Sequence, residues 1–374
     1  MRFPVSARLF QIQHRSLALL GCALVAAAVV AGCTSVDRWL VAMPTDAELA
    51  SLRDSDAAIE PPAAPTPEPA ELPAELPAES NPEVPRFFPS DIMAKLELTT
   101  SRGDPADVYY PRVKEPAPEL RFPIALLLQG LNVDKAHYSR YAQRVARYGF
   151  VVVVPNHRTS IRGSDELFAQ VGQVTDTLLT ARAIDRDPGS PLFDRIDSSQ
   201  LVLLGHSHGG MMGLDAIRGA CDVPFCVGEY SLPDELKAAV FFGTALWEDG
   251  EYLRIDNTSI PVALIAGDRD SLIGIEETRQ TYAQIVTPPR ALIELRGVNH
   301  YGITDTDNPS GSPLEQSEST IAQSDSITAI ADWSGRFLRG HLRADRAALR
   351  SVYRFEPERH GVGDVPTAIE SQLR

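Results

Sequence analysis

The sequence predicts an α/β fold in which helices cover both faces of a mostly parallel central sheet. Short runs of continuous apolar residues recur along the chain, as strands buried on both faces of a parallel sheet require. Segments with apolar residues at helical spacing lie between these runs, and this alternation is typical of α/β proteins. The stretch between Gly243 and Ile260 leaves no room for a large lid domain, so we expect an open cleft.

The expected elements begin near residue 94. Alternating residues at 94–113, around a turn at 102–105, predict an opening hairpin. Buried strands are expected at 123–130, 150–155, 201–204, 237–243, 261–267 and 291–295. Helices are expected where apolar residues recur: Tyr138, Tyr141, Val145 and Tyr148; Leu167, Phe168, Val171, Val174 and Leu178, after Ser164; residues 211–220; Ile275, Tyr282 and Ile285; Ile327, Ile330, Trp333 and Phe337.

The first 33 residues have the form of a secretory signal. A basic start without acidic residues is followed by an apolar run of about 14 residues, fewer than the roughly 20 that span a bilayer. The run ends at Val30-Ala31-Gly32-Cys33, which resembles the lipobox of bacterial lipoproteins. We therefore expect lipidation of Cys33, with an uncleaved signal anchor as the alternative. Because Thr34 and Ser35, and no Asp, come directly after Cys33, the expected location is the extracytoplasmic cell envelope, at the outer membrane or periplasm rather than the inner membrane.

A proline-rich segment follows the expected signal. Residues 61–85 contain nine prolines, frequent glutamates and a short AELP repeat, so they cannot form a core. We expect residues 34–86 to be a disordered tether, residues 87–343 to form the catalytic domain, and residues 344–374 to be a polar tail.

The charge of the chain excludes one class of partner. The net charge is −15, and beyond the first 32 residues 32 basic residues stand against 50 acidic ones. Such a surface repels phosphate backbones and anionic lipid headgroups. We expect no nucleic-acid partner, and contact with the membrane only through the lipid anchor.

The segment Gly205-His206-Ser207-His208-Gly209 has the G-x-S-x-G pattern of a nucleophile elbow. It follows an apolar strand and precedes a helical segment, which is the context that the motif requires. The turn is so tight that a side chain at either glycine would collide with its surroundings. Ser207 is therefore the expected nucleophile.

A serine nucleophile needs a base and a group that orients the base. On this order of elements an acid and then a histidine should follow at strand ends. His300 follows the strand at 291–295 and is the expected base. Asp270, after the strand at 261–267, is the expected acid, because it lies deeper in its loop than Asp268. The rivals for the acid are Asp268, which could brace the turn instead, and Glu248 or Asp249.

The expected oxyanion hole consists of the backbone N–H groups of Leu131 and His208. His206 and His208 form an H-x-H pair, but no further ligand with metallohydrolase spacing accompanies them. We therefore expect no metal. In an exported protein, Cys221 and Cys226 are expected to form a disulfide, the alternative being two buried thiols.

Four segments together resemble the α/β-hydrolase superfamily: GHSHGG, QGLNVDKAHYSRYAQRVARYGFVVVVPNH, GDRDSLIG and ELRGVNHYG. The branch of chlorophyllases, dienelactone hydrolases, platelet-activating-factor acetylhydrolases and cutinase-like polyesterases is the most similar, over about residues 97–340. The resemblance implies cofactor-free serine ester hydrolysis by Ser207, Asp270 and His300, with a small-molecule, lipid or polymer ester as substrate. Gln129 stands where many relatives have histidine. Trp247 stands where polyesterases place an aromatic wall of the acyl site, and a packing role is the alternative.

Two other functions fit the same fold. A binding protein of the cell envelope could keep the fold without catalysis, although it would need none of the three residues above. A serine amidase or peptidase would keep the triad, but such peptidases usually carry an extra propeller or helical cap, which this sequence lacks.

Overall fold

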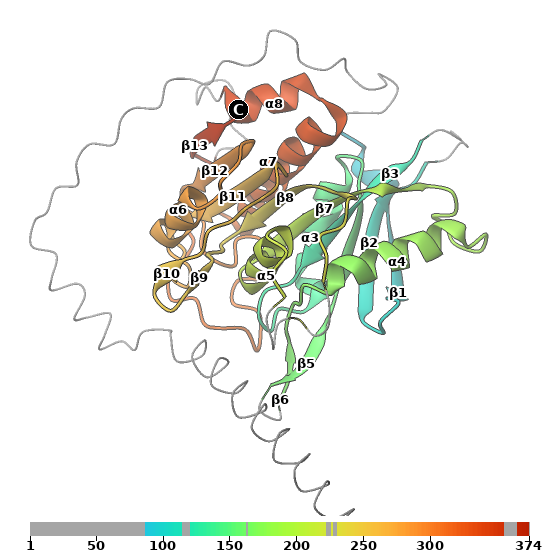
Figure 1. Ribbon diagram of the computed structural model, residues 1–374, viewed down its shortest axis with the longest axis horizontal. Coiled ribbons are helices and arrows are strands. Elements are labelled where there is room, and N and C mark those ends of the chain that lie inside the picture. Colours follow the sequence, from blue (N-terminus) through green and yellow to red (C-terminus); the bar gives the residue numbers. More distant parts are fainter. Residues whose placement is uncertain are drawn as a thin grey trace, which may run out of the picture. The chain divides into compact units, whose positions relative to one another are not determined.

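The computed structural model describes residues 87–113, 120–161, 164–221, 226, 230–354 and 365–373 (Figure 1). The expected signal peptide, Cys33 and the tether at 34–86 lie outside these residues. Within the described residues, no helix is both long and apolar enough to cross a membrane.

A nine-stranded sheet forms the centre of the described part of the chain, with the order β1-β2-β4-β3-β7-β8-β11-β12-β13. The strands from β4 to β12 in this order are parallel, whereas β1, β2 and β13 are antiparallel to their neighbours. The mostly parallel sheet predicted from the sequence is thus confirmed. The strands are β1 Met93–Thr99, β2 Pro105–Pro111, β3 Phe122–Leu128, β4 Val151–Pro155, β7 Ile196–His206, β8 Leu236–Phe242, β11 Val262–Gly267, β12 Arg290–Leu295 and β13 Thr367–Gln372.

Helices cover both faces of this sheet. In Figure 1, α4 (Gln173–Arg186), α5 (His208–Ile217) and α6 (Ile275–Ala283) lie in front of the sheet, where they contact β3, β7, β8, β11 and β12. On the other face, α3 (Ser139–Ala146) contacts β2 and β4, and α7 (Gln323–Arg343) contacts β7, β8 and β11. Short 3₁₀ helices, η1 (Ser90–Ile92) and η2 (Lys135–Tyr138), precede β1 and α3.

The alternation of side chains along β8 shows how the two layers are built. Phe242 packs in the cluster of buried residues that includes Trp333 and Phe337 of α7. The preceding residue, Phe241, points to the opposite face, because its ring lies where a side chain at Gly213 of α5 would stand. Both aromatic rings are buried, which is why this strand reads as continuously apolar.

The structure differs from the sequence prediction after β4. The apolar residues from Leu167 predicted a helix beginning after Ser164, but the helix α4 begins only at Gln173. Residues Arg158–Ile161 (β5) and Ser164–Leu167 (β6) instead form an antiparallel hairpin that extends beyond the sheet in Figure 1. Phe168 is buried, and its ring is tilted against that of His208, so its apolar character reflects a loop contact and not a helical face.

The described residues after 343, which are 344–354 and 365–373, belong to the fold and do not form a polar tail. The helix α8 (Arg346–Tyr353) packs on α7, and β13 adds an antiparallel edge strand to β12. Buried Leu349, Val352 and Tyr353 anchor this segment. The prediction failed because these apolar residues are few and β13 alternates with polar residues, as expected of an edge strand.

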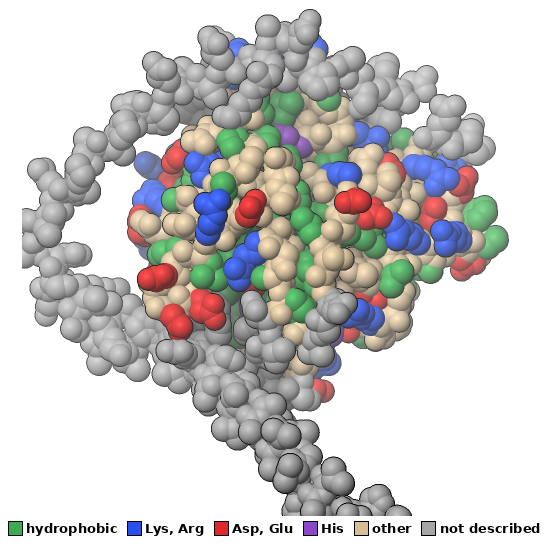
Figure 2. All heavy atoms as spheres, viewed as in Figure 1, with side chains coloured by type: hydrophobic (Ala, Val, Ile, Leu, Met, Phe, Trp, Pro, Cys, Tyr) green, Lys and Arg blue, Asp and Glu red, His purple; other side chains and the backbone are tan. Residues whose placement is uncertain are grey.

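Acidic and basic side chains are interspersed over the face shown in Figure 2. Several of them form ion pairs across elements, such as Arg279 of α6 with Glu294 of β12 at 2.7 Å. Charges of both signs are therefore mixed on this face.

Candidate active site

Loops that carry the expected functional residues meet at one edge of the sheet. The strands β3, β7, β8, β11 and β12 are parallel and adjacent, so their carboxyl ends lie at the same edge. Leu131, Ser207, Asp270 and His300 follow β3, β7, β11 and β12 respectively. Residues that are far apart in the sequence are brought together in this way.

Ser207 occupies a strained turn between β7 and α5. Its φ is 54° and its ψ is −125°, a conformation that non-glycine residues rarely adopt. A Cβ at Gly205 would lie 2.8 Å from the carbonyl oxygen of Gly209, and one at Gly209 would lie 2.6 Å from that of Gln129. Both glycines of the motif are thus required by close backbone contacts, as the sequence predicts. The carbonyl of Ser207 accepts hydrogen bonds from the N–H of Gly210 and the hydroxyl of Thr244, both at 2.9 Å, which hold the turn.

The expected acid and base are in direct contact. His300 Nδ1 lies 2.8 Å from Asp270 Oδ2, and both side chains are almost completely buried. The other carboxylate oxygen, Asp270 Oδ1, accepts the N–H groups of Leu272 at 3.0 Å and Ile273 at 2.8 Å. Both oxygens of the Asp270 carboxylate thus accept hydrogen bonds, and the Nδ1–H of the His300 imidazole is the donor to Oδ2. This tautomer leaves Nε2 of His300 as a proton acceptor.

The other acidic residues considered for this role lie elsewhere. Asp268 Oδ1 accepts the N–H of Gly297 at 2.6 Å and so braces the turn between the two loops. Glu248 and Asp249 lie at the exposed end of the hairpin formed by β9 (Trp247–Glu248) and β10 (Glu251–Tyr252). Of the candidates, Asp270 is the one that the structure brings to His300.

Gly243, at the end of β8, makes room for the Asp270–His300 pair. Its φ is +56°, and a Cβ there would lie 3.0 Å from Asp270 Oδ2 and 3.2 Å from His300 Nδ1. The sequence alone shows no role for Gly243 in the site. Its position directly after a buried parallel strand was the available signal.

His206 connects the two sides of the site through a chain of buried hydrogen bonds. The N–H of Gly130 donates to the hydroxyl of Tyr138 at 2.9 Å, and this hydroxyl lies 2.9 Å from His206 Nδ1. His206 Nε2 lies 2.9 Å from the carbonyl oxygen of His300. Because a carbonyl only accepts, Nε2 carries the proton and Nδ1 accepts from Tyr138.

The protonation states agree with this chain. Burial, and in addition the neighbouring His300, lowers the pKa of His206 well below its usual range, so the ring is neutral. Burial raises the pKa of the Tyr138 hydroxyl, so it keeps the proton that it donates. With both nitrogens bound, His206 has no lone pair left for a substrate or a metal.

His208 faces the segment before α4. Its Nε2 lies 3.1 Å from the carbonyl oxygen of Ala169, and its ring lies 3.9 Å from the ring of Phe168 between centroids. Burial lowers the pKa of His208 to about 4. Its backbone begins α5, where the first N–H groups of a helix point away from the helix body. Within the described residues, no group of three or more His, Cys, Asp or Glu side chains is arranged to hold a metal ion.

The loop after β3 lies against the serine turn. A Cβ at Gly130 would lie 3.4 Å from Ser207 Cβ, and the next residue, Leu131, is half-buried. Among the described residues, no acceptor is hydrogen-bonded to the N–H of Leu131. Gln129 is completely buried and donates from Nε2 to the carbonyl of His157 at 3.2 Å. Gln129 therefore braces the loop after β3 against the residue that follows β4 by two positions, His157.

Ser207 itself is half-exposed, and the ring of its neighbour His206 is tilted against that of His300, with 4.8 Å between the centroids. In the described part of the chain, no hydrogen bond joins Ser207 Oγ to His300. Such bonds are often long in sites without substrate. Trp247 is half-exposed on β9, opposite Tyr252 of β10.

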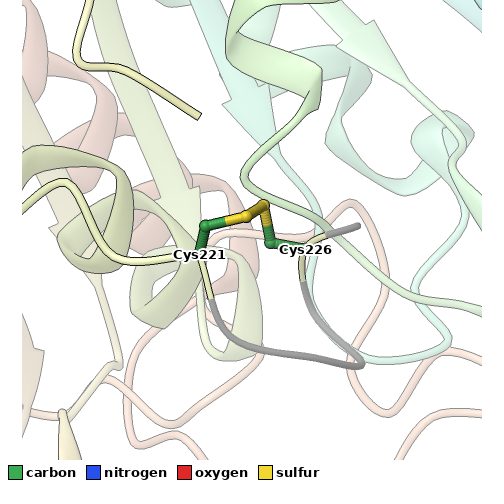
Figure 3. Close-up of a disulfide and its surroundings, with 2 residues drawn as sticks. All are labelled: Cys221 and Cys226. Carbon is green, nitrogen blue, oxygen red and sulfur yellow. A yellow bond between two sulfur atoms is a disulfide. The ribbon is translucent and has the colours of Figure 1, made fainter. Parts of the chain in front are cut away.

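The predicted disulfide is present between Cys221 and Cys226, with their Cα atoms 4.9 Å apart (Figure 3). It closes a loop directly after α5, the helix that follows the serine turn.

One buried acidic residue near the site cannot be recognised from the sequence. Glu315 is 4% exposed and accepts hydrogen bonds from the backbone of Ser271 and His300. It lies in a polar loop without periodicity or motif, so only its contacts reveal it.

The chlorophyllase family model matches residues 95–222. Three similar curated proteins are cutinases. Cutinase est2 of Thermobifida alba is 26% identical over 54% of this chain and 59% of its own length. Cutinase 2 of Thermobifida cellulosilytica is 25% identical over 52% and 64%, and cutinase cut1 of Thermobifida fusca is 25% identical over 52% and 53%.

The chain thus spans between 53% and 64% of the length of these relatives. The sheet order, the turn at Ser207 and these matches agree with each other. The chain has a fold consistent with that of the α/β hydrolases, and it is similar to chlorophyllases and cutinases.

Proposed function

We propose that the protein is a serine hydrolase of carboxylic esters. Ser207 is the nucleophile, His300 the general base and acid, and Asp270 the group that orients and stabilises the imidazole. The observation that carries the proposal is the 2.8 Å contact between His300 Nδ1 and Asp270 Oδ2 beside the strained turn of Ser207. Similarity to proteins named as cutinases supports the choice of esters.

The reaction proceeds through an acyl-enzyme. His300 Nε2 takes the proton of the Ser207 hydroxyl as the oxygen attacks the ester carbonyl. The same proton is given to the leaving alcohol, and Ser207 keeps the acyl group. A water molecule then attacks this ester while His300 takes its proton, and the return of that proton to Ser207 releases the acid. Asp270 stays ionised throughout and stabilises the imidazolium that forms in each half.

The negative charge on the tetrahedral intermediate needs fixed donors. The backbone N–H groups of Leu131 and His208 supply them. Leu131 lies in the loop packed against Ser207, and His208 begins the helix directly after it. The positive end of the α5 dipole adds to the stabilisation of an oxyanion there.

Bulky esters, lipid or polymer esters included, are the proposed substrates. The segment between β8 and β11 forms only the small hairpin β9–β10, which does not amount to a lid domain. Trp247 on this hairpin is half-exposed, and we assign it to the wall of the acyl site. Hydrolysis rates for esters of graded acyl length, compared between the wild type and Trp247→Ala, test this assignment.

The proposed location is the bacterial cell envelope, with the protein held by a lipid on Cys33 and directed away from the cytoplasm. The support is the signal-like N-terminus that ends at Cys33. Mass spectrometry of the mature N-terminus tests this proposal. Cys33→Ser should move the protein from the membrane fraction to the soluble fraction.

The catalytic proposal is tested with p-nitrophenyl esters and a fluorophosphonate probe. We expect turnover and labelling at Ser207, and Ser207→Ala should leave only about 10³ to 10⁴ over the rate in water. A protein that neither turns over esters nor reacts with the probe would be a binding protein instead. Faster hydrolysis of a matched anilide than of the ester would identify an amidase.

A further inference from the structure

A buried carboxylate links the loops that carry Asp270 and His300. Glu315 lies between β12 and α7 and is almost completely buried. Its Oε2 accepts the N–H of Ser271 at 2.9 Å and that of His300 at 3.3 Å. Its Oε1 accepts the N–H of Ser317 at 2.6 Å and the hydroxyl of Ser271. One side chain thus binds the acid loop, the histidine loop and its own segment.

These contacts explain how a charge is tolerated at this buried position. A buried carboxylate is unfavourable unless donors replace the lost water. Both oxygens of Glu315 face donors, so the ionised form is satisfied. Backbone N–H groups in irregular loops need acceptors, and Glu315 supplies them where no strand or helix does.

The segment of Glu315 is itself fixed to the histidine loop. The N–H of Glu315 donates to Asn308 Oδ1 at 2.7 Å. Asn299 Nδ2 donates to the carbonyl of Ser317 at 3.1 Å, and the hydroxyl of Tyr301 donates to the carbonyl of Pro313. The backbone on both sides of Glu315 is therefore fixed, and this fixes the position of its carboxylate.

We propose that Glu315 is a positioning residue that sets the geometry between the Asp270 carboxylate and the His300 imidazole. It binds the residue next to Asp270 and the backbone of His300 itself, so it acts on both partners of their hydrogen bond. The expected effect of Glu315 on the reaction rate rests on the proposed ester hydrolysis. Small displacements of reacting groups reduce the rate strongly, because the reaction requires a narrow range of geometries.

Glu315→Gln tests the proposal because glutamine keeps the shape of the side chain. Oε2 faces fixed N–H groups of Ser271 and His300, and Oε1 faces that of Ser317. Either orientation of the amide therefore places its NH₂ group against a backbone N–H. We expect kcat per active site to fall about tenfold while KM changes little. Active sites are counted by reaction with the fluorophosphonate, which removes any unfolded fraction from the comparison.

A second measurement does not depend on turnover. The proton shared by His300 Nδ1 and Asp270 gives a far-downfield NMR resonance when it is buried and hydrogen-bonded. We expect this resonance to shift or broaden in Glu315→Gln, because the variant alters the geometry of that bond.

Asp345→Asn is the matched control. Asp345 is also a buried carboxylate that accepts two backbone N–H groups, those of Ala347 and Ala348, but it caps α8 and pairs with Arg339 at 2.9 Å, away from the Asp270 and His300 loops. We expect its substitution to lower stability while kcat per active site and the downfield resonance stay as in the wild type. A change in kcat and resonance as large as in Glu315→Gln would mean that loss of stability explains both, and would overturn the proposal.

The proposal would also be overturned if Glu315→Gln had the same kcat per active site and the same downfield resonance as the wild type, whatever the stability of the variant. If that variant does not fold, Ser271→Ala decides, because it removes the hydroxyl that donates to Glu315 and keeps the backbone N–H of Ser271 that also donates to it. The same hydroxyl accepts the N–H of Gln316 at 3.2 Å, so the substitution loosens the segment of Glu315 as well. We then expect kcat to fall about threefold, and no change in kcat or resonance would refute the role. A wild type without esterase activity or probe labelling would instead refute the proposed function, and the resonance would still test Glu315.

Discussion

Removal of the buried hydroxyl of Tyr138 should break the hydrogen bonds that link the loop after β3, which carries Gly130, to His206 beside the serine turn. Tyr138 is fully buried and is the middle member of the chain from Gly130 to His206. Tyr138→Phe removes a single oxygen atom and leaves no large cavity. It also leaves two buried groups without a partner, the N–H of Gly130 and Nδ1 of His206. Since each unsatisfied buried group costs about 1 to 3 kcal/mol, we expect a loss of about 4 kcal/mol in the free energy of unfolding.

Tyr141→Phe is the matched control for this substitution. Tyr141 is 2% exposed, and its hydroxyl donates to Ser334 Oγ at 3.0 Å. Ser334 also donates to the carbonyl of Ile330, so its hydroxyl stays bonded when Tyr141 is changed. The expected loss is therefore about 1 kcal/mol, the net value of one hydrogen bond.

Urea unfolding of both variants, at a pH where the wild type is fully folded, measures the difference directly. The kinetic effect is measured on a soluble ester. Because Gly130 precedes Leu131, we expect Tyr138→Phe to lower kcat about tenfold, a fraction of the loss caused by removing an oxyanion donor, and Tyr141→Phe to leave it unchanged. Equal stabilities of the two variants would refute the reasoning, since the chain of hydrogen bonds would then contribute no more than an isolated pair.

Three further predictions follow from the site and its surroundings. Asp270→Asn should lower kcat about 10⁴-fold, because the imidazole loses its orienting acceptor. Asp268→Asn should mainly lower stability. Pre-steady-state rates measure the first effect, and unfolding curves measure the second. Burial lowers the pKa of His208 to about 4, so between pH 6.5 and 4 only the unfolded chain takes up its proton. The free energy of unfolding should therefore fall by up to about 3 kcal/mol as the pH decreases through this range. His208→Gln keeps a donor for the carbonyl of Ala169, and its free energy of unfolding should depend less on pH. Wild type and variant with the same pH dependence would contradict this. Replacement of Cys221 and Cys226 by serine should cost about 2 kcal/mol for so short a loop, and equal stability of oxidised and reduced wild type would contradict that value.

The order of the main elements could be predicted from the sequence. The apolar runs at β3, β4, β7, β8, β11 and β12 predicted strands because both faces of these strands are buried. The hairpin β5–β6 and the strand β13 could not be predicted in this way. Their residues pair at the periphery, where polar and apolar side chains are mixed and the pattern carries little information.

The candidate site was predictable where chemistry fixes residue type and order. Ser207 between two glycines, and Asp270 and His300 at later strand ends, follow from the needs of a serine nucleophile. Gly205 and Gly209 were predictable for the same reason, since a tight turn excludes side chains at both.

Only the tertiary structure decided between Asp270 and Asp268, which lie in one loop and differ in whether they reach His300 or Gly297. It also assigned His206 to the chain through Tyr138, and Glu315 to the backbone of two loops. Sequence determines residues whose type is dictated by a local conformation or by a reaction. The roles of Tyr138, His206 and Glu315 depend on partners that are distant in the chain, and hydrogen bonds at such range exist only once the sheet has brought the loops together.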